Sequence, residues 1–219
     1  MTLLSLYKNI KSYYPDARII IADDSKEPLD LPNVIQLPFN SGISKGLAVA
    51  LEAVETPYVM RLDDDMLLTP HTNIHKELDF LIRHPEVDLV AVMADHKNPK
   101  IYAARFENIR MDKNLLIPAD TIIEGRKVAY KTPNCFLART EKLRLVGYDE
   151  NIRINEHYEF FSRAAGKLVS VLDPESYIMH CHNRFEKEDY DQYRYDTFEA
   201  NRYVRGKHAS KYQGLVAGH

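Results

Sequence analysis

Apolar positions along the first 95 residues follow two different spacings, which together predict alternating helices and strands. A helical period appears in three segments, at 3–14, 47–54 and 73–85. Short runs rich in β-branched residues predict buried strands at 18–24, 33–39, 58–62 and 87–93. These runs are continuously apolar and lack the polar alternation of a strand with one face in water. We therefore predict an α/β fold with a mostly parallel central sheet and helices on both faces.

The rest of the chain is less regular. Residues 96–134 are polar, with a weak strand signal at 101–107, and predict a hairpin or a mobile loop. Strands are expected again at 134–140, 168–173 and 177–182, and a short helix before Gly147. After residue 183 the sequence is charged and rich in tyrosine, which indicates surface helices. We expect one domain over 1–183, with 184–219 as a C-terminal extension of the same domain.

Composition narrows the class of protein. The chain has 219 residues, of which 45% are hydrophobic and 28% charged, and its formal net charge is −3. These values are typical of a globular domain and give no electrostatic footprint for nucleic acid. The two cysteines, Cys135 and Cys181, lie far apart, which fits a reducing compartment and predicts a cytoplasmic protein. We find no signal peptide and no apolar run of about 18 residues, so no transmembrane segment is predicted. The sequence does not indicate an oligomeric state.

Acidic residues follow directly after two of the predicted strands. Asp23 and Asp24 end the first strand, and Asp63, Asp64 and Asp65 follow the third. In an open α/β sheet, ligands bind beyond the carboxyl ends of the strands. Three adjacent carboxylates repel one another, so they need either open water or a cation. A solvated acidic turn meets the first need, and a divalent cation shared with a nucleotide diphosphate meets the second.

Four segments, in order, resemble the nucleotide-sugar glycosyltransferases of the GT-A fold, in the large family 2. They are YYPDARIIIADDS (13–25), YVMRLDDDMLLT (58–69), NCFLARTEKLRLVGYD (134–149) and EHYEFF (156–161). In particular they resemble the β-1,4-N-acetylgalactosaminyltransferase, or ganglioside-synthase, type. The resemblance covers residues 10–183 and implies a single, Rossmann-like GT-A domain with a DXD motif. Family members usually open with a strand before the first helix, and we expect that first strand to be absent here.

The resemblance implies roles for the acidic clusters. Asp23 and Asp24 would face the uracil and ribose of a UDP-sugar. Asp63 and Asp64 would lie at the nucleotide, with Asp63 at the ribose. Asp65, together with Asp63, would ligate Mn²⁺ or Mg²⁺ with the diphosphate of the donor.

The resemblance also implies further residues of the nucleotide and metal sites. Gly42 and Lys45, in the loop after the second strand, would lie near the nucleotide. In many GT-A enzymes, a histidine late in the chain completes the metal shell. His180 and His182 alternate along a predicted strand, so only one of them can point at the metal. We prefer His182, because a small polar loop begins there.

A catalytic base is expected in the segment NEHYEFFSRAAG (155–166), which matches the acceptor-side helix of the family. In many members the base is the second acid of a Glu-Asp pair, and here that pair is Glu156 and His157. The ganglioside-synthase type has a His-x-Glu-Phe-Phe motif instead, which matches His157 and Glu159. Glu159, His157 and Glu156 are therefore the candidates, and we favour Glu159.

These expectations combine into a metal-dependent and inverting glycosyltransferase that moves a sugar from a UDP-sugar to a hydroxyl of a glycan acceptor. One alternative is a degenerate GT-A module that binds a glycan or nucleotide without chemistry. Another is a sugar-nucleotide nucleotidyltransferase, although such an enzyme would have a glycine-rich, basic phosphate loop near its start. A calcium-binding domain is disfavoured, because Asp63–Asp65 lacks the ligand spacing of a calcium loop. The sugar and the acceptor are not specified by these patterns.

Overall fold

A computed structural model of the chain describes residues 3–93, 115–153, 156–181, 202–204 and 206–208. The principal helices are α1 (Leu3–Tyr13), α2 (Ile43–Glu52), α3 (Ile74–Arg83), α5 (Thr140–Val146) and α6 (Glu156–Ala164). The strands in the first half are β1 (Ile21–Asp23), β2 (Val34–Gln36), β3 (Tyr58–Arg61), β4 (Met66–Leu67) and β5 (Leu89–Met93). Those in the second half are β6 (Ile122–Ile123), β7 (Arg126–Val128), β8 (Phe136–Arg139), β9 (Ser170–Tyr177) and β10 (Met179–His180). The helices and strands predicted for residues 3–93 occur in the predicted order, with β4 as an additional strand.

The central sheet has six strands in the order β3-β8-β5-β9-β7-β6. Strands β5 and β9 pair in parallel, whereas β8 runs antiparallel between β3 and β5. Strand β7 is antiparallel to both β9 and β6. The expectation of a mostly parallel sheet is therefore corrected to a mixed sheet. The physical reason is that a continuous apolar run reports burial on both faces of a strand and carries no information on strand direction.

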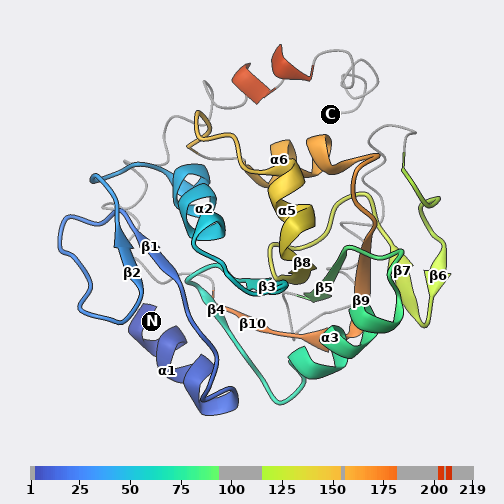
Figure 1. The fold of residues 1–219 in the computed structure, drawn as a ribbon, viewed down its shortest axis with the longest axis horizontal. Helices are drawn as coiled ribbons and strands as arrows, with labels where there is room; N and C mark the ends of the chain where they lie inside the picture. The colour runs from blue at the N-terminus through green and yellow to red at the C-terminus, as the bar shows by residue number, and fades with distance from the viewer. Residues whose placement is uncertain (1–2, 94–114, 154–155, 182–201, 205, 209–219) are drawn as a thin grey trace.

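The mixed sheet still has the carboxyl ends of β3, β5 and β9 at the same edge. Because β8 is antiparallel to both of its neighbours, β3 and β5 run in the same direction, and β9 runs with β5. Their carboxyl ends therefore lie at one edge of the sheet, which is where ligands bind in open α/β folds. Strands β1 and β2 form a separate parallel pair (Figure 1).

Helices cover both faces of the central sheet, as predicted. Strand β5 is buried along its whole length, and its side chains alternate between the apolar clusters on the two faces of the sheet. Leu89, Ala91 and Met93 pack with apolar residues of α2, α5 and α6, whereas Val90 packs with Phe80 of α3. Figure 1 shows α2, α5 and α6 on one side of the sheet and α3 on the other.

A small two-stranded element places the acidic turn after β3. The amide of Met66 donates to the carbonyl of Asp63 over 3.2 Å, so the acidic triplet forms a turn between β3 and β4. Strand β4 then pairs antiparallel with β10, with Met66 opposite His180. The sequence analysis did not predict β4, because two residues carry no periodic signal.

The predicted irregular middle segment contains a hairpin. Strands β6 and β7 are joined at Glu124 and Gly125, whose φ angles of 46° and 78° fit a tight two-residue turn. The weak strand signal at 101–107 lies outside the described residues, as does most of the predicted extension at 184–219. Within the described parts of the chain, no helix is both long enough and apolar enough to cross a membrane.

A buried charge network joins α3 to the sheet. Glu77 is only 1% exposed, and its Oε2 accepts a hydrogen bond of 3.0 Å from Nε of Arg126. Arg126 and Lys76 both reach Asp173 on β9, at 3.4 and 3.0 Å. Burial, together with the neighbouring carboxyl group of Asp173, raises the pKa of Glu77 to about 8.

This network predicts a pH dependence of stability. The folded chain keeps the Glu77 proton up to about pH 8, whereas an unfolded glutamate loses it near pH 4.5. The folded state therefore binds more protons in this window, so the free energy of unfolding falls as the pH rises from about 4.5 to 8. Glu77→Gln should remove most of this slope, which is on the order of a few kcal/mol over the whole window. Urea unfolding at several pH values measures the slope.

Asp79→Asn makes the same change of charge on the exposed side of α3 and serves as the control. A slope in Glu77→Gln equal to that of the wild type would contradict the assignment.

Candidate functional site

The acidic triplet after β3 sends its three carboxylates to different places. Asp63 Oδ1 accepts a hydrogen bond of 2.9 Å from Arg61, which is the last residue of β3. Asp65 Oδ2 lies 2.9 Å from Nε2 of His180 on β10. Asp64 is exposed. The divergence relieves the repulsion between neighbouring carboxylates, because Asp63 and Asp65 each face a different positive or proton-donating group.

The contact between Asp65 and His180 is fixed by the backbone on both sides. The pairing of β4 with β10 sets the register, and the amide of Cys181 donates to the carbonyl of Asp65 over 2.9 Å. The structure thus brings together the expected metal ligand Asp65 and His180, one of the two candidate histidines. The preferred candidate, His182, lies outside the described residues.

The pair can be tested as a place for a divalent cation. Two neighbouring ligands of an octahedral ion with bonds of about 2.1 Å are about 3 Å apart. The separation of 2.9 Å between Asp65 Oδ2 and His180 Nε2 fits this geometry. Among the described residues, no three His, Cys, Asp or Glu side chains gather closely enough to hold an ion. Asp65 and His180 alone would supply two ligands, so a cation at this pair would need its other ligands from outside the described residues.

Arg61 lies at the centre of the contacts behind the acidic turn. One terminal nitrogen of its guanidinium donates to Asp63 Oδ1 at 2.9 Å and to Glu156 Oε1 at 3.4 Å. The other donates to the carbonyl of Asn134 at 2.6 Å. Arg61 is buried, and burial opposes its charge, but Asp63 and Glu156 outweigh that effect and raise its pKa. The guanidinium therefore joins the acidic turn to the first turn of α6.

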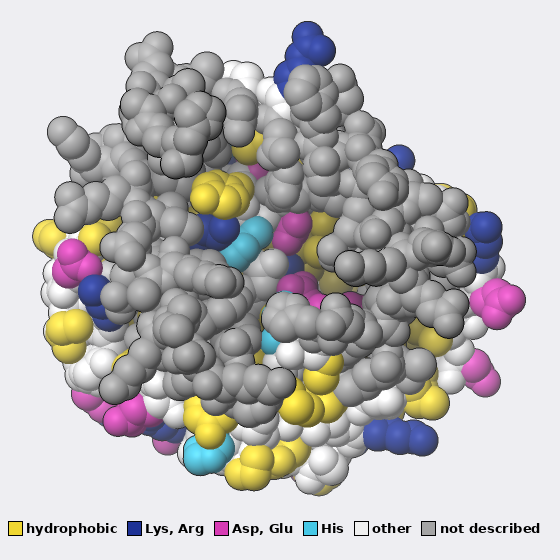
Figure 2. Space-filling model, turned by 180° about the vertical axis from the view of Figure 1, so that it is seen from behind, with side chains coloured by type: hydrophobic (Ala, Val, Ile, Leu, Met, Phe, Trp, Pro, Cys, Tyr) yellow, Lys and Arg dark blue, Asp and Glu magenta, His cyan; other side chains and the backbone are white. Residues whose placement is uncertain are grey.

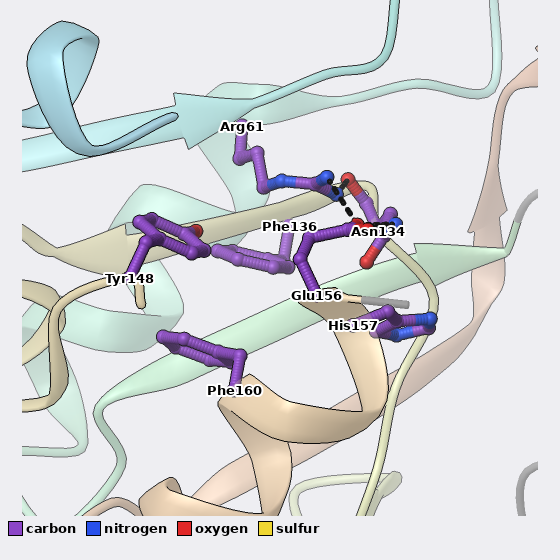
Figure 3. Close-up of a pocket in the computed structure, with 7 residues that line it drawn as sticks. All are labelled: Arg61, Asn134, Phe136, Tyr148, Glu156, His157 and Phe160. Carbon is purple, nitrogen blue, oxygen red and sulfur yellow. Dashed lines mark hydrogen bonds and ion pairs between the residues drawn. The ribbon is translucent and has the colours of Figure 1, made fainter. Parts of the chain in front are cut away.

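A small, nearly closed pocket lies beside this cluster. Its walls combine the polar side chains of the cluster with three aromatic rings, and its lining residues are Arg61, Asn134, Phe136, Tyr148, Glu156, His157 and Phe160. Figure 3 shows Glu156, at the start of α6, directed toward Arg61 and Asn134, and the ring of Phe160, one turn further along the helix, facing Tyr148. The rings of Phe160 and Tyr148 stack at 5.1 Å. Burial raises the pKa of Tyr148 to about 12, so its hydroxyl keeps its proton at neutral pH.

His157 and Lys131 belong to the same region. His157 Nε2 faces the carbonyl of Thr132, which accepts its hydrogen. Burial and the charges of Lys131 and Arg61 hold the pKa of His157 well below its usual value, so the ring is uncharged at neutral pH. Burial also lowers the pKa of Lys131 to about 8, and its ammonium lies 3.7 Å from the ring centre of Tyr158. Seen from behind, Figure 2 shows histidine and acidic side chains in a hollow beside a basic one.

Glu159, the residue favoured as the base, lies elsewhere. Its two oxygens accept hydrogen bonds of 2.6 and 2.7 Å from Arg163, one turn further along α6. Lys207 lies 2.9 Å from the same carboxylate. Burial opposes its charge, but these cations prevail and lower the pKa of Glu159. The structure brings Glu156 and His157 to the pocket and does not bring Glu159 there.

The first acidic cluster organises the loops beside the sheet. Asp23 is buried, and its two oxygens accept backbone hydrogen bonds from Ser25 at 2.9 Å and Leu29 at 3.0 Å. Burial opposes its charge, yet these bonds lower the pKa of Asp23. Asp24 Oδ2 accepts a hydrogen bond of 2.9 Å from the amide of Gly42. The predicted nucleotide residues of β1 and of the following loop are thus joined.

Lys45 has a partner outside the expected nucleotide site. Its ammonium forms an ion pair with Glu150, in the segment that follows α5. The same segment lies close to Gly42, since a Cβ added there would be 3.0 Å from the Cα of Arg153. The loop before α2 therefore packs against residues 149–153.

Sequence reasoning missed Arg61, Asn134 and Tyr148. Arg61 had a signal, because a charged residue inside an apolar strand needs a buried partner. Asn134 and Tyr148 had no comparable signal. Their position in the pocket follows from the antiparallel insertion of β8 and from the packing of α5, neither of which is visible in local patterns.

The fold and the strand-end site define the class of protein. The model of glycosyl transferase family 2 matches residues 2–147, and the chain belongs to this family. The predicted family is thereby confirmed.

Two curated relatives are similar to this chain over most of its length. The chain is 31% identical over 216 residues to Beta-1,4 N-acetylgalactosaminyltransferase 2 of Mus musculus, a match that covers 88% of this chain and 41% of that protein. It is 34% identical over 181 residues to Beta-1,4 N-acetylgalactosaminyltransferase 1 of Rattus norvegicus, covering 76% of this chain and 34% of that protein. The chain thus spans less than half the length of these relatives.

Solved structures confirm the predicted GT-A fold. Residues 1–349 of S. aureus TarS in complex with UDP-GlcNAc match with a TM-score of 0.62 and 14% identity, over 93% of this chain and 61% of that one. The mannosyltransferase PcManGT from Pyrobaculum calidifontis, in complex with GDP-Man and Mn²⁺, matches with a TM-score of 0.51 and 14% identity. That match covers 84% of this chain and 52% of the mannosyltransferase.

The packing at Gly42 gives a testable prediction. Its φ of 93° and ψ of 156° lie in a region that is essentially restricted to glycine. Gly42→Ala should therefore lower the free energy of unfolding by about 1–3 kcal/mol. Gly46→Ala is the matched control in α2, where an added Cβ meets Ala22 at an ordinary 3.5 Å. That control should be neutral or stabilising by up to about 1 kcal/mol. Urea unfolding compares the two, and equal effects would contradict the proposed strain.

Proposed function

We propose that the chain catalyses the metal-dependent, inverting transfer of a sugar from a UDP-sugar to a hydroxyl group of a glycan acceptor. The observation that carries the proposal is the arrangement after β3. Asp65 lies beside His180, while Asp63 and Glu156 share one buried guanidinium. Membership of glycosyl transferase family 2 supports the reaction class. Inversion is what the family resemblance implies.

The proposed donor is a UDP-sugar, with N-acetylgalactosamine as the first sugar to test. The names of the curated relatives support this sugar, and the TarS structure, which contains UDP-GlcNAc, supports uridine as the nucleoside. The base and ribose would lie against Asp23, Asp24 and the loop at Gly42. Asp23 would act mainly by holding the loop at 24–29, to which both of its oxygens are bonded. Lys45 would exchange Glu150 for a phosphate group of the donor.

The diphosphate would lie at Asp65 and His180, next to Asp63 and Asp64. A divalent cation bound there, Mn²⁺ or Mg²⁺, would neutralise the negative charge on the departing UDP. Asp65 supplies a carboxylate oxygen and His180 an imidazole nitrogen, both of which are suitable ligands for such ions. The two side chains are already at the spacing of neighbouring ligands, so little reorganisation of the chain is needed.

Glu156 is the proposed base that takes the proton from the acceptor hydroxyl. Among the three candidates, it is the carboxylate that lines the pocket and also lies next to the acidic turn, through Arg61. His157 lines the same pocket, but its lowered pKa makes the ring a weak proton acceptor. Glu159 is engaged by Arg163 and Lys207 and is not among the lining residues. A base must lie within hydrogen-bonding reach of the proton that it takes, which favours Glu156.

Asp65→Ala tests the nucleotide and metal site. Wild-type protein with UDP-N-acetylgalactosamine and Mn²⁺ should release UDP as the sugar passes to water, and Asp65→Ala should slow this release at least about 100-fold, because charge on the leaving UDP is no longer neutralised. Asp79→Asn, on the exposed side of α3, is the control and should keep wild-type turnover. A coupled assay for free UDP measures the rates.

Two outcomes would contradict the proposal in different ways. Undiminished turnover in excess chelator would remove the metal from the mechanism. Binding of UDP without release from any UDP-sugar would support the alternative of a degenerate binding module.

Glu156→Gln tests the base. The change keeps the shape of the side chain and removes its proton-accepting charge, so kcat should fall about 10²–10⁴-fold while KM for the donor changes little. Glu159→Gln is the matched comparison on the same helix. It should lower the melting temperature and leave kcat nearly unchanged, because Glu159 anchors Arg163 and Lys207. Steady-state kinetics and thermal unfolding separate the two, and the reverse pattern would assign the base to Glu159.

A further inference from the structure

Arg61 connects two parts of the proposed site that come from distant parts of the chain. Its Nη2 lies 2.9 Å from Asp63 Oδ1 and 3.4 Å from Glu156 Oε1, and these two acids are separated by 93 positions in the sequence. Its Nη1 donates to the carbonyl of Asn134 at 2.6 Å, and its guanidinium carbon lies 5.9 Å from the ring centre of Phe136. The guanidinium is thus held on several sides.

Both hydrogen bonds that the described residues donate to the Glu156 carboxylate go to the same oxygen. Its Oε1 receives hydrogen bonds from Arg61 at 3.4 Å and from the side-chain amide of Asn134 at 3.2 Å. Among the residues that the structure describes, none donates to Oε2. Within the described part of the chain, one oxygen is therefore fixed by two donors, and the other receives none and can accept a proton from an acceptor hydroxyl.

We propose that Arg61 is a positioning residue for sugar transfer, which holds the Glu156 carboxylate at a set place relative to Asp63, with Asn134 as its second support. The inference rests on the proposed function and deepens it. The nucleotide lies at Asp63 and the acceptor at Glu156, so the guanidinium fixes the separation between the two substrates. Misplacement of a reacting group by about 1 Å can cost about 10²-fold in rate.

The geometry requires arginine at this position. A guanidinium presents a planar fork, so one of its nitrogens can serve two carboxylates while another serves a carbonyl. A lysine ammonium is a single point charge on a flexible stem and would leave at least one of the three oxygens without its donor. Arg61→Lys therefore keeps the charge and removes the positioning, which separates the two effects.

A double-mutant cycle tests the inference. The variants are Arg61→Lys, Glu156→Gln and the double variant, with UDP release from UDP-N-acetylgalactosamine as the measured rate. If Arg61 acts through Glu156, Arg61→Lys alone should lower kcat about 10–100-fold and change the donor KM less than about threefold. In the Glu156→Gln background, the same change should cost less than about threefold, because the group being positioned is already inactive.

Arg139→Lys is the matched control. Arg139 is half-buried, and its guanidinium binds the carbonyls of Val87 and Leu81 and the hydroxyl of Tyr58, away from the pocket residues. This change should lower the melting temperature while leaving kcat unchanged. A role of Arg61 that is only structural would behave in the same way.

Asn134→Ala keeps the inference testable if Arg61→Lys does not fold. Asn134 is less buried, and the change removes the second donor to the same oxygen of Glu156. It should lower kcat about 3–10-fold, again without an additive effect in the Glu156→Gln background.

The outcomes separate the inference from the proposed function. Two results in an active wild-type chain would overturn the positioning role alone. One is that the effects of Arg61→Lys and Glu156→Gln on kcat are additive, and the other is that Arg61→Lys leaves kcat unchanged. A wild-type chain that releases no UDP from any UDP-sugar would overturn the proposed function and the positioning role together.

Discussion

Burial of the Arg61 guanidinium is the constraint on which the site depends. Removing a cation from water costs several kcal/mol unless anionic and carbonyl oxygens are arranged around it. Arg61 obtains these oxygens from Asp63, Glu156 and Asn134. They belong to the turn after β3, the first turn of α6 and the segment leading into β8, so the guanidinium is satisfied only when all three have docked. Assembly of the site therefore depends on the docking of all three segments.

The insertion of β8 between β3 and β5 makes this arrangement possible. It places the segment before β8 beside the end of β3, and it also carries Phe136 into the apolar wall of the pocket. The pairing of β4 with β10 supplies the second constraint, because it brings His180 to Asp65 across 115 positions of the sequence. Helix α6 then closes the cluster with its amino-terminal end. The polar centre of the site thus rests on backbone pairing between distant segments.

Local patterns were sufficient for the elements and for the acidic clusters. Apolar runs ending in aspartates predicted β1 and β3, and the resemblance directed attention to the start of α6, where Glu156 lies. Strand direction was not predictable, because burial on both faces looks the same in parallel and antiparallel strands. The sequence did not indicate that Glu156 is a better candidate for the base than Glu159. The difference is that Arg163 and Lys207 bind Glu159, and their positions relative to this carboxylate are set by packing.

The central claim is that Asp65 and His180 hold the cation that binds the donor diphosphate. Diffraction from crystals grown with UDP and Mn²⁺, recorded at the manganese absorption edge, tests it most directly. The account predicts one anomalous peak at about 2.1 Å from both Asp65 Oδ2 and His180 Nε2, in contact with the diphosphate. Bound UDP with no manganese at this pair, and with Asp65 still hydrogen-bonded to His180, would contradict it.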